Sequence, residues 1–233
     1  VYNEDDAEVK RVSEAATNPI RKLPYSTPAY SVSDGVTLLE TPEGPMPIEV
    51  FGAHNLNNLA GAKWICQNMG VDEADFYEAI ASFKGASKRL EKIAEGKGRV
   101  AYKDFAHSPS KVAATTKAVK EQYPNRTLVA CLELHTYSSL NAEFLKEYEG
   151  ALEYADEAVV FYSPDAVKIK QLEEVTYEQI AKAFNRKDLI IYTNPAEFKQ
   201  YLFNRNLDNS ALLLMSSGNY GGLNFDEVKQ LIE

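Results

Sequence analysis

The sequence has little cysteine, little histidine and no long apolar run, and each shortage excludes a class of protein. Its 233 residues include 2 Cys and 3 His, which is too few for a disulfide framework. The two thiols, Cys66 and Cys131, lie far apart and fit a reducing compartment. The longest apolar runs, such as residues 211–215, are much shorter than the roughly 20 residues that span a bilayer. We therefore expect no membrane partner.

Positive charge and several catalytic motifs are also missing. Lys and Arg total 25 against 34 for Asp and Glu, which gives a formal net charge of −9. This balance excludes a uniformly basic nucleic-acid-binding face, so we expect no nucleic acid partner. The chain has no phosphate-binding Gly-x-x-x-x-Gly-Lys loop, no dinucleotide-binding Gly-x-Gly-x-x-Gly, no His-Glu-x-x-His and no Gly-x-Ser-x-Gly. Three scattered histidines do not have metal-ligand spacing, so no residue is assigned to a metal.

What the sequence does contain is a change of pattern along the chain. Prolines exclude long helices from the first fifty residues, where residues 36–40 and 48–51 predict a pair of hairpin strands. Helical spacing follows over residues 55–68 and 75–83, and a polar stretch at 84–88 predicts a joint between two domains.

From residue 98 onward, apolar strands alternate with amphipathic helices. The expected strands are residues 100–102, 128–134, 158–162, 189–192 and 211–215. The expected helices are residues 110–123, 142–154, 177–184, 196–204 and 225–232. This alternation predicts an α/β fold with a Rossmann-like, doubly wound, mostly parallel sheet. Cys131 falls inside one of the apolar strands, where we expect a core thiol rather than a nucleophile.

The loops that follow three of these strands carry the polar side chains of interest. Ligands bind beyond the carboxyl ends of the strands in open parallel sheets, and here these ends lead into residues 104–109, 135–139 and 216–222. Each loop has an ordinary structural explanation: Asp104 can satisfy loop amides, the serines at 138 and 139 can cap a helix, and the glycines can form a turn.

Taken together, the polar residues predict a site for a nucleotide or a carboxylate-bearing ligand. Asp104 can accept hydrogen bonds from ribose hydroxyls, and Arg89 in the polar joint can reach a phosphate. The asparagines at 55, 57 and 58 can match an adenine edge or can be ordinary helix-start residues. The amides of the glycine-rich loop can bind an anion.

In their order along the chain, four segments resemble motifs of the Mur ligase family, the ATP-dependent amide-forming enzymes of peptidoglycan assembly. They are residues 2–6 (Tyr-Asn-Glu-Asp-Asp), 52–58 (Gly-Ala-His-Asn-Leu-Asn-Asn), 83–91 (Phe-Lys-Gly, then Lys-Arg-Leu-Glu) and 104–109 (Asp-Phe-Ala-His-Ser-Pro). The resemblance covers essentially the whole chain. It implies that residues 1–83 are the incomplete C-terminal part of the family's central ATP-binding domain. Residues 84–233 then correspond to the family's C-terminal domain.

The resemblance also implies roles for individual residues. Asn55 and Asn58 hold adenine, Asp104 binds ribose, and His107 lies beside the nucleotide. Arg89 is the catalytic residue, which contacts phosphate. The candidates for binding the incoming substrate are His135, Thr136, Ser217 and Gly218. The implied cofactors are ATP and magnesium, whose ligands lie mostly upstream of this chain.

The implied activity is a cytoplasmic ligase of peptidoglycan synthesis or recycling. A carboxylate of UDP-N-acetylmuramate becomes an acyl phosphate, which the incoming amine attacks. Residues 89–91, 132–134 and 215–222 resemble the branch that adds the peptide L-Ala-γ-D-Glu-meso-diaminopimelate more than the relative that adds L-alanine. His135 and Thr136, however, stand where that branch has an arginine-bearing segment. The alternatives are a non-catalytic nucleotide- or peptide-binding module and a structural interaction domain.

The start of the chain bears on the same hypothesis. It begins at Val1 rather than Met, and it has no phosphate-binding loop. We therefore expect the chain to be the back half of a longer ligase and to be inactive by itself.

Overall fold

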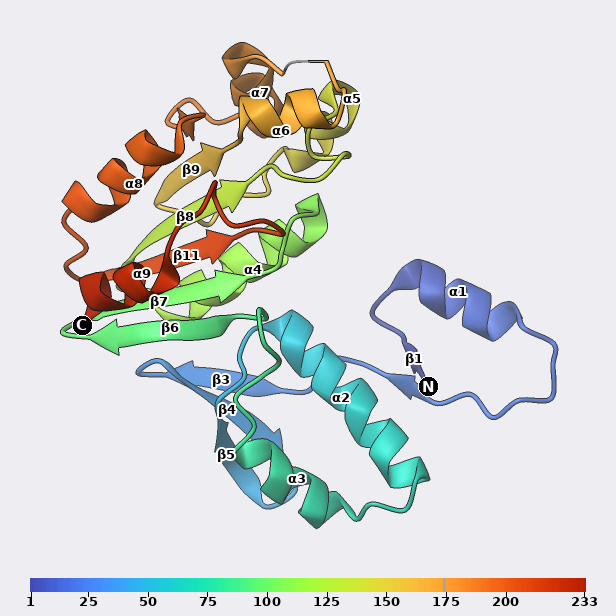
Figure 1. The fold of residues 1–233 in the computed structure, drawn as a ribbon. Helices are drawn as coiled ribbons and strands as arrows, with labels where there is room; N and C mark the ends of the chain where they lie inside the picture. The colour runs from blue at the N-terminus through green and yellow to red at the C-terminus, as the bar shows by residue number, and fades with distance from the viewer. Residues whose placement is uncertain (174) are drawn as a thin grey trace. The chain divides into compact units, whose positions relative to one another are not determined.

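The computed structural model describes residues 1–173 and 175–233 and divides into two compact units, Val1–Gly85 and Ala86–Glu233 (Figure 1). Within the described residues, no helix is both long and apolar enough to cross a membrane.

The Val1–Gly85 unit combines short strands with three helices. Its elements are β1 (Tyr2–Asn3), α1 (Ala7–Ala15), β2 (Pro24–Tyr25), β3 (Tyr30–Ser33), β4 (Val36–Thr41), β5 (Gly44–Ile48), α2 (Ala53–Asn68) and α3 (Glu73–Ala81). Strands β3, β4 and β5 form an antiparallel sheet, and β1 pairs in parallel with β2. Leu39 and Ile48 of the sheet pack with Leu56, Leu59 and Phe76 of the helices in a small core.

The predicted hairpin forms, but its second strand was placed too late in the sequence. That strand was expected at residues 48–51 and is β5, Gly44–Ile48, which contains Pro45 and Pro47. Proline lacks the N–H that a central strand must donate, so it is confined to edges. β5 is the outer strand of its sheet, and it therefore tolerates both prolines.

The Ala86–Glu233 unit is built on one six-stranded sheet. The strands are β6 (Glu91–Gly96), β7 (Arg99–Asp104), β8 (Thr127–Glu133), β9 (Glu157–Phe161), β10 (Ile190–Tyr192) and β11 (Ser210–Met215). The order across the sheet is β10-β9-β8-β11-β7-β6, and only β6 runs antiparallel to its neighbour. Figure 1 shows the arrows of β7, β8, β9 and β11 pointing the same way.

Helices follow almost every strand of this sheet. They are α4 (Pro109–Gln122), α5 (Ala142–Leu145), the 3₁₀ helix η1 (Lys146–Tyr148), α6 (Pro164–Ile169), α7 (Tyr177–Phe184), α8 (Pro195–Asn204) and α9 (Phe225–Ile232). Strand β11 returns to lie between β8 and β7, so the direction of the connections reverses after β10. Because crossovers between parallel strands are right-handed, α8 lies on the opposite face of the sheet from α4. The predicted α/β fold with a doubly wound, mostly parallel sheet is confirmed.

The core follows from this double covering. Every residue of β11 is buried, as expected for a strand covered on both faces. Leu212 and Leu214 share one cluster with Phe198 of α8 and Val228 of α9, whereas α4 contacts β8 and β11 and contributes nothing to that cluster. Cys131 is completely buried there, and burial raises the pKa of its thiol. The prediction of a core thiol is confirmed.

Three parts of the alternating pattern differ from the prediction, and one of them is the short helix α6, which was not expected. The helix expected over residues 142–154 is only α5 followed by η1, and the chain then turns through Gly150, whose φ is +74°. That left-handed conformation ends a helix, and glycine adopts it readily. Strand β6 was not predicted, because its sequence Glu-Lys-Ile-Ala-Glu-Gly is mostly polar. An edge strand needs few apolar residues, and charged side chains suit it.

Candidate functional site at the carboxyl ends of the central strands

The carboxyl ends of β7, β11 and β8 lie side by side. Met215 at the end of β11 aligns with Asp104 of β7 and with Leu132 of β8. The backbone N–H of Ser216 then donates to the carbonyl oxygen of Asp104 at 2.9 Å. After β7 and β8 the chain turns to one face of the sheet, and after β11 it turns to the other. Ligand crevices of doubly wound sheets form where the chain diverges in this way.

Asp104 is a buried carboxylate, only 7% exposed, at the end of β7. Its Oδ2 accepts a hydrogen bond from the backbone N–H of Leu90 at 2.7 Å, and its Oδ1 accepts one from Ala106 at 2.6 Å. The loop-amide role that the sequence also allowed is therefore present. Carboxylate oxygens can each accept a further hydrogen bond, so ribose binding stays a prediction for this residue.

Arg89 is exposed on a turn with an unusual backbone. Its two neighbours, Lys88 and Leu90, have φ angles of +57° and +44°, which non-glycine residues rarely adopt. The turn is fixed from the loop after β7, because Asp104 binds the N–H of Leu90 and Phe105 donates to the carbonyl oxygen of Lys88 at 2.9 Å. The guanidinium carbon lies 5.5 Å from the centroid of the Phe105 ring. Phe105 thus supports the side chain that the sequence singled out, although its own role was not predicted.

His107 is tied to the same loop. Its Nδ1 lies 2.9 Å from the carbonyl oxygen of Phe105, which can only accept, so Nδ1 carries the proton in the neutral ring. The ring meets that of Phe105 edge to face with centroids 5.2 Å apart, and the hydroxyl of Tyr148 donates to the carbonyl oxygen of His107. The structure therefore brings Arg89, Asp104 and His107 together around Phe105.

Glu133, the last residue of β8, is a buried acid that the sequence analysis did not select. It is 2% exposed, and its Oε2 accepts hydrogen bonds from the hydroxyl of Ser216 and, at 2.9 Å, from the N–H of Tyr220. Ser216 Oγ in turn accepts from the N–H of Gly218 at 2.6 Å. The signal that could have found Glu133 is a single carboxylate in an otherwise apolar strand, since a buried charge needs partners.

The other carboxylate oxygen of Glu133 faces a predicted site residue. Nδ1 of His135 lies 3.6 Å from Oε1 of Glu133, and the His135 side chain is 40% exposed. At that separation the contact is electrostatic rather than a hydrogen bond. Glu133 therefore joins the end of β8 to His135 and to the loop between β11 and α9.

The glycines of this loop serve two different purposes. Tyr220, Gly221 and Gly222 have φ angles of +54°, +70° and +103°, so the expected positive-φ turn is present. Gly218 is needed for close approach: a Cβ there would lie 2.8 Å from Oε2 of Glu133 and 3.0 Å from Cγ of His135. Glycine at this position lets the loop backbone rest directly on the Glu133–His135 pair.

Tyr220 fixes the far end of the loop. Its hydroxyl lies 2.7 Å from the carbonyl oxygen of Cys131 and 2.8 Å from that of Met215. Burial raises the pKa of Tyr220 well above its usual range, so the hydroxyl stays a donor. Its ring stacks on Phe198 with centroids 5.0 Å apart. Next to this anchor, the buried hydroxyl of Ser217 has no hydrogen-bond partner in the described part of the chain.

Thr136 closes the turn after β8. Its N–H donates to Oγ of Ser139 at 2.9 Å, and its hydroxyl also contacts Ser138 and Ser139. The alternative explanation of these serines as helix caps is wrong, because Asn141 caps α5 and accepts from two of its N–H groups. Thr136 has a structural role here, and substrate binding by it stays a prediction.

Asn55 and Asn58 lie in the other unit, on α2. Nδ2 of Asn55 donates to the carbonyl oxygen of Phe51 at 2.9 Å, and Asn58 is exposed. Asn57, between them, is 9% exposed, and its Nδ2 lies within 3.2 Å of acceptors on three residues of the N-terminal segment. These acceptors are on Asn3, Asp5 and Thr27. Asn57 thus serves the fold, and the exposed Asn58 is available to a ligand.

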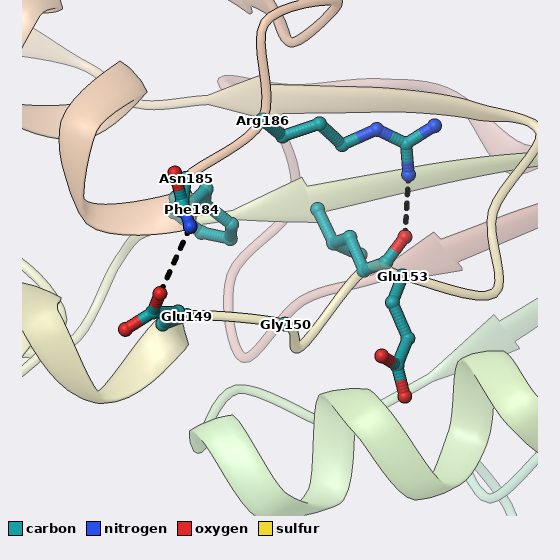
Figure 2. Close-up of a pocket in the computed structure, with 7 residues that line it drawn as sticks. Glu149, Gly150, Glu153, Phe184, Asn185 and Arg186 are labelled. Carbon is teal, nitrogen blue, oxygen red and sulfur yellow. Dashed lines mark hydrogen bonds between the residues drawn. The ribbon is translucent and has the colours of Figure 1, made fainter.

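A hollow of about 410 Å³ lies elsewhere in the Ala86–Glu233 unit, in segments that precede β9 and β10 (Figure 2). Its polar groups bind one another: Nδ2 of Asn185 donates to Glu149 at 2.9 Å, and Arg186 donates to the carbonyl oxygen of Leu152 at 2.5 Å. Nor does any group of three or more potential metal ligands occur within residues 1–173 and 175–233. The predicted site residues Asp104, His107 and His135 gather instead at the carboxyl ends of β7 and β8, which we take as the candidate site.

Known proteins resemble this chain in both sequence and fold. The UDP-N-acetylmuramate–L-alanine ligase of Lactococcus lactis subsp. cremoris is 27% identical over 148 residues, which are 64% of this chain and 33% of that protein. The ligase of the same name from Microcystis aeruginosa is 31% identical over 185 residues, 76% of this chain and 37% of that protein. The chain thus spans about a third of the length of the curated relatives it matches.

Three solved structures share the fold at 18–19% identity. The UDP-N-acetylmuramate–alanine ligase from Thermotoga maritima has a TM-score of 0.62 and covers 88% of this chain and 44% of its own. The murein peptide ligase from Psychrobacter arcticus has a TM-score of 0.57 and covers 85% and 42%. The MurF ligase from Thermotoga maritima in complex with ADP has a TM-score of 0.58 and covers 88% and 44%.

A family model connects this fold to the candidate site. The model described as "Mur ligase, glutamate ligase domain" matches residues 88–218, which is more than half of the chain. The matched segment begins next to Arg89 and ends at Gly218, so it contains the loops that follow β7 and β8 and the first residues of the loop that follows β11. This chain belongs to the Mur ligase family.

Proposed function

We propose that this chain is the C-terminal part of an ATP-dependent ligase of peptidoglycan synthesis or recycling. The ligase joins the carboxylate of UDP-N-acetylmuramate to the amino group of an amino acid or peptide. The observation that carries the proposal is the family match over residues 88–218, because that segment holds the polar residues gathered at the carboxyl ends of β7, β11 and β8. Non-catalytic binding and purely structural roles are the alternatives, and loss of turnover in site variants distinguishes catalysis from both.

The division of the chain agrees with this proposal. Residues 1–83 are proposed as the end of a central ATP-binding domain, and residues 84–233 as a C-terminal domain. The compact units Val1–Gly85 and Ala86–Glu233 support that assignment. The curated relatives are about three times as long as the matched region, which supports a longer parent protein. Both cysteines are free, in keeping with a cytoplasmic location.

The proposed nucleotide is ATP, which supplies the phosphoryl group that activates the substrate carboxylate. The donor set fits it: within the described residues the exposed guanidinium of Arg89 forms no ion pair, and such a group suits a phosphate. We assign Asn55 and Asn58 to adenine. Asp104 and His107 are assigned to the ribose side. The ADP bound in a fold neighbour supports this ligand class. Magnesium is proposed to accompany ATP, with ligands mostly outside this chain.

Positioning is the main task of these residues during the reaction. The substrate carboxylate attacks the γ-phosphate, and the acyl phosphate is then attacked by the amine, with release of phosphate. Fixed charges that neutralise the transferring phosphoryl group lower the barrier most when they are held in place beforehand. The turn that carries Arg89 is held in this way by Asp104 and Phe105. His135, Thr136, Ser217 and Gly218 are proposed to bind the incoming amine substrate.

Two acceptors fit the observations. L-alanine is supported by the names of the curated relatives. The peptide L-Ala-γ-D-Glu-meso-diaminopimelate is supported by the motifs at residues 132–134 and 215–222. Specificity of this kind depends on a few pocket contacts rather than on the fold.

An assay of phosphate release by the full-length protein tests both the proposed ligase activity and the identity of the acceptor. UDP-N-acetylmuramate and ATP are supplied with L-alanine, with the tripeptide, or with neither. We expect release that depends on the nucleotide sugar and on one acceptor, and the faster acceptor identifies the branch. Release that is absent with both acceptors contradicts the proposed function.

A further inference from the structure

The carboxylate next to His135 indicates that this histidine has a role beyond substrate binding. In the structure, Glu133 is the acid that faces this ring, with Oε1 at 3.6 Å from Nδ1, and it is buried at the end of β8. A nitrogen that faces a carboxylate is favoured to carry the ring proton. The neutral ring then has its lone pair on Nε2, on the side away from Glu133, and the 40% exposure of the side chain lets a ligand reach it.

The carboxylate of Glu133 is itself held in one orientation. Oε2 is bound by two donors, the hydroxyl of Ser216 and the N–H of Tyr220, so Oε1 is left for His135. The loop backbone at Gly218 lies against both Glu133 and His135, at a distance that no larger residue could keep. The loop therefore packs against both the carboxylate and the imidazole.

We propose that Glu133 is a positioning residue that holds His135 with its proton on Nδ1, so that Nε2 accepts a proton from the ammonium group of the incoming substrate. This proposal rests on the proposed function and adds the group that makes the amine nucleophilic. The ammonium gives one proton to Nε2, which yields a neutral amine and an imidazolium whose charge faces Glu133. The amine lone pair then forms the C–N bond at the activated carboxyl carbon. The C–O bond to phosphate breaks, phosphate leaves with its electron pair, and the second proton of the attacking nitrogen passes to that departing phosphate, which leaves a neutral amide.

Ring tautomers can be measured on this chain without any substrate, so the test is independent of ligase activity. The chain has only 3 His, and ¹⁵N-labelled histidine therefore gives a simple long-range ¹H–¹⁵N spectrum. It is recorded at about pH 8.5, above the ordinary imidazole pKa near 6.5. His135→Gln identifies the His135 signals. His107 is an internal reference, because the Phe105 carbonyl oxygen keeps its proton on Nδ1.

Glu133→Gln gives a specific expectation. Ser216 and Tyr220 both donate to the Oε2 position, so they select the amide oxygen there. The amide NH₂ then faces Nδ1 of His135, and its positive edge favours the lone pair rather than the proton on that nitrogen. We expect the wild-type His135 ring to carry its proton on Nδ1 and the Glu133→Gln ring to carry it on Nε2, while His107 stays unchanged.

Ser216→Ala is the matched control. It removes one donor to Glu133 and loosens the loop but keeps the carboxylate, so we expect His135 to keep its proton on Nδ1. The proposal is overturned by a wild-type proton on Nε2, by an unchanged tautomer in Glu133→Gln, or by a switch in Ser216→Ala. Glu133→Gln is judged unfolded if the His107 reference signals are lost. In that case the wild-type and Ser216→Ala spectra still test the proposal, because a proton on Nε2 of His135 in either of them overturns it.

Discussion

At the scale of single residues, local motifs located the site, but pairs of distant residues determine what each side chain does. Asp104 and His107 stood out because they directly follow a predicted strand. Glu133 was missed because its partners Ser216 and Tyr220 lie 83 and 87 positions away. Only the insertion of β11 beside β8 brings them together. A sequence pattern shows that a buried acid needs partners, but not which partners the sheet order supplies.

Arg89 allows a direct test at this scale. Arg89→Ala in the full-length protein is expected to lower turnover in the phosphate-release assay by about a hundredfold, the usual effect of losing one charge contact in the transition state. Arg89→Lys keeps the charge but not the planar fork, so it should recover part of that loss. Lys187→Ala removes an exposed charge in the loop before β10 and should leave turnover unchanged. Wild-type turnover in Arg89→Ala would rule out the assignment.

At the scale of elements, the sequence predicts well wherever burial dictates the pattern. β8, β9 and β11 are apolar throughout or nearly so, and α7 and α9 were expected at the residues where they occur. Two of the misses, the misplaced β5 and the unpredicted β6, are edge strands whose sequences are rich in proline or charge. The helix over 142–154 was overextended because its apolar spacing continues past Gly150. Backbone conformation at one glycine, which periodicity does not report, ended it.

The junction of β9 with the end of α8 gives a prediction about pH. Glu157, the first residue of β9, accepts hydrogen bonds from the hydroxyl of Tyr201 and from Arg205, which directly follows α8. Burial alone would raise the pKa of this carboxyl, but the bonds from Arg205 and Tyr201 outweigh burial and hold it below 4.5. A group whose pKa is lowered by folding stabilises the fold above its unfolded pKa. That contribution disappears as the pH falls through the folded pKa.

We therefore expect Glu157→Gln to lower the free energy of unfolding by about 2 kcal/mol at pH 7, the usual loss for hydrogen bonds to a charged group. The difference between variant and wild type should shrink as the pH falls below 4.5, the ordinary value of this carboxyl. Urea unfolding at pH 7, 5 and 3.5 measures it. Glu153→Gln, at an exposed carboxyl, serves as the control and should show little change. An equal loss at all three pH values would mean that packing, not charge, explains the effect.

At the scale of the whole molecule, charge and composition only excluded classes of partner. The alternation of apolar strands and amphipathic helices predicted the doubly wound sheet. The net charge of −9 and the absence of long apolar runs limited the possible partners but pointed to no reaction. The order of strands across the sheet was not predictable, because β11 could have paired at an edge as readily as between β8 and β7. That order places Asp104, Ser216 and Glu133 in one row, and this row is the basis of the candidate site.

The Ala86–Glu233 unit is expected to fold without the rest of the chain. All six strands of its sheet pair with one another, and the core cluster that contains Leu212 and Leu214 draws only on residues of this unit. A segment of this size buries roughly 68–70% of its unfolded surface, which is enough for an independent domain. Residues 86–233 expressed alone should unfold in urea in one cooperative transition and should keep the His107 and His135 ring signals of the whole chain. A broad transition, or exposed apolar surface detected by dye binding, would show instead that residues 1–85 are needed to complete the fold. In that case the site at the carboxyl ends of β7, β11 and β8 could not be studied in the unit alone.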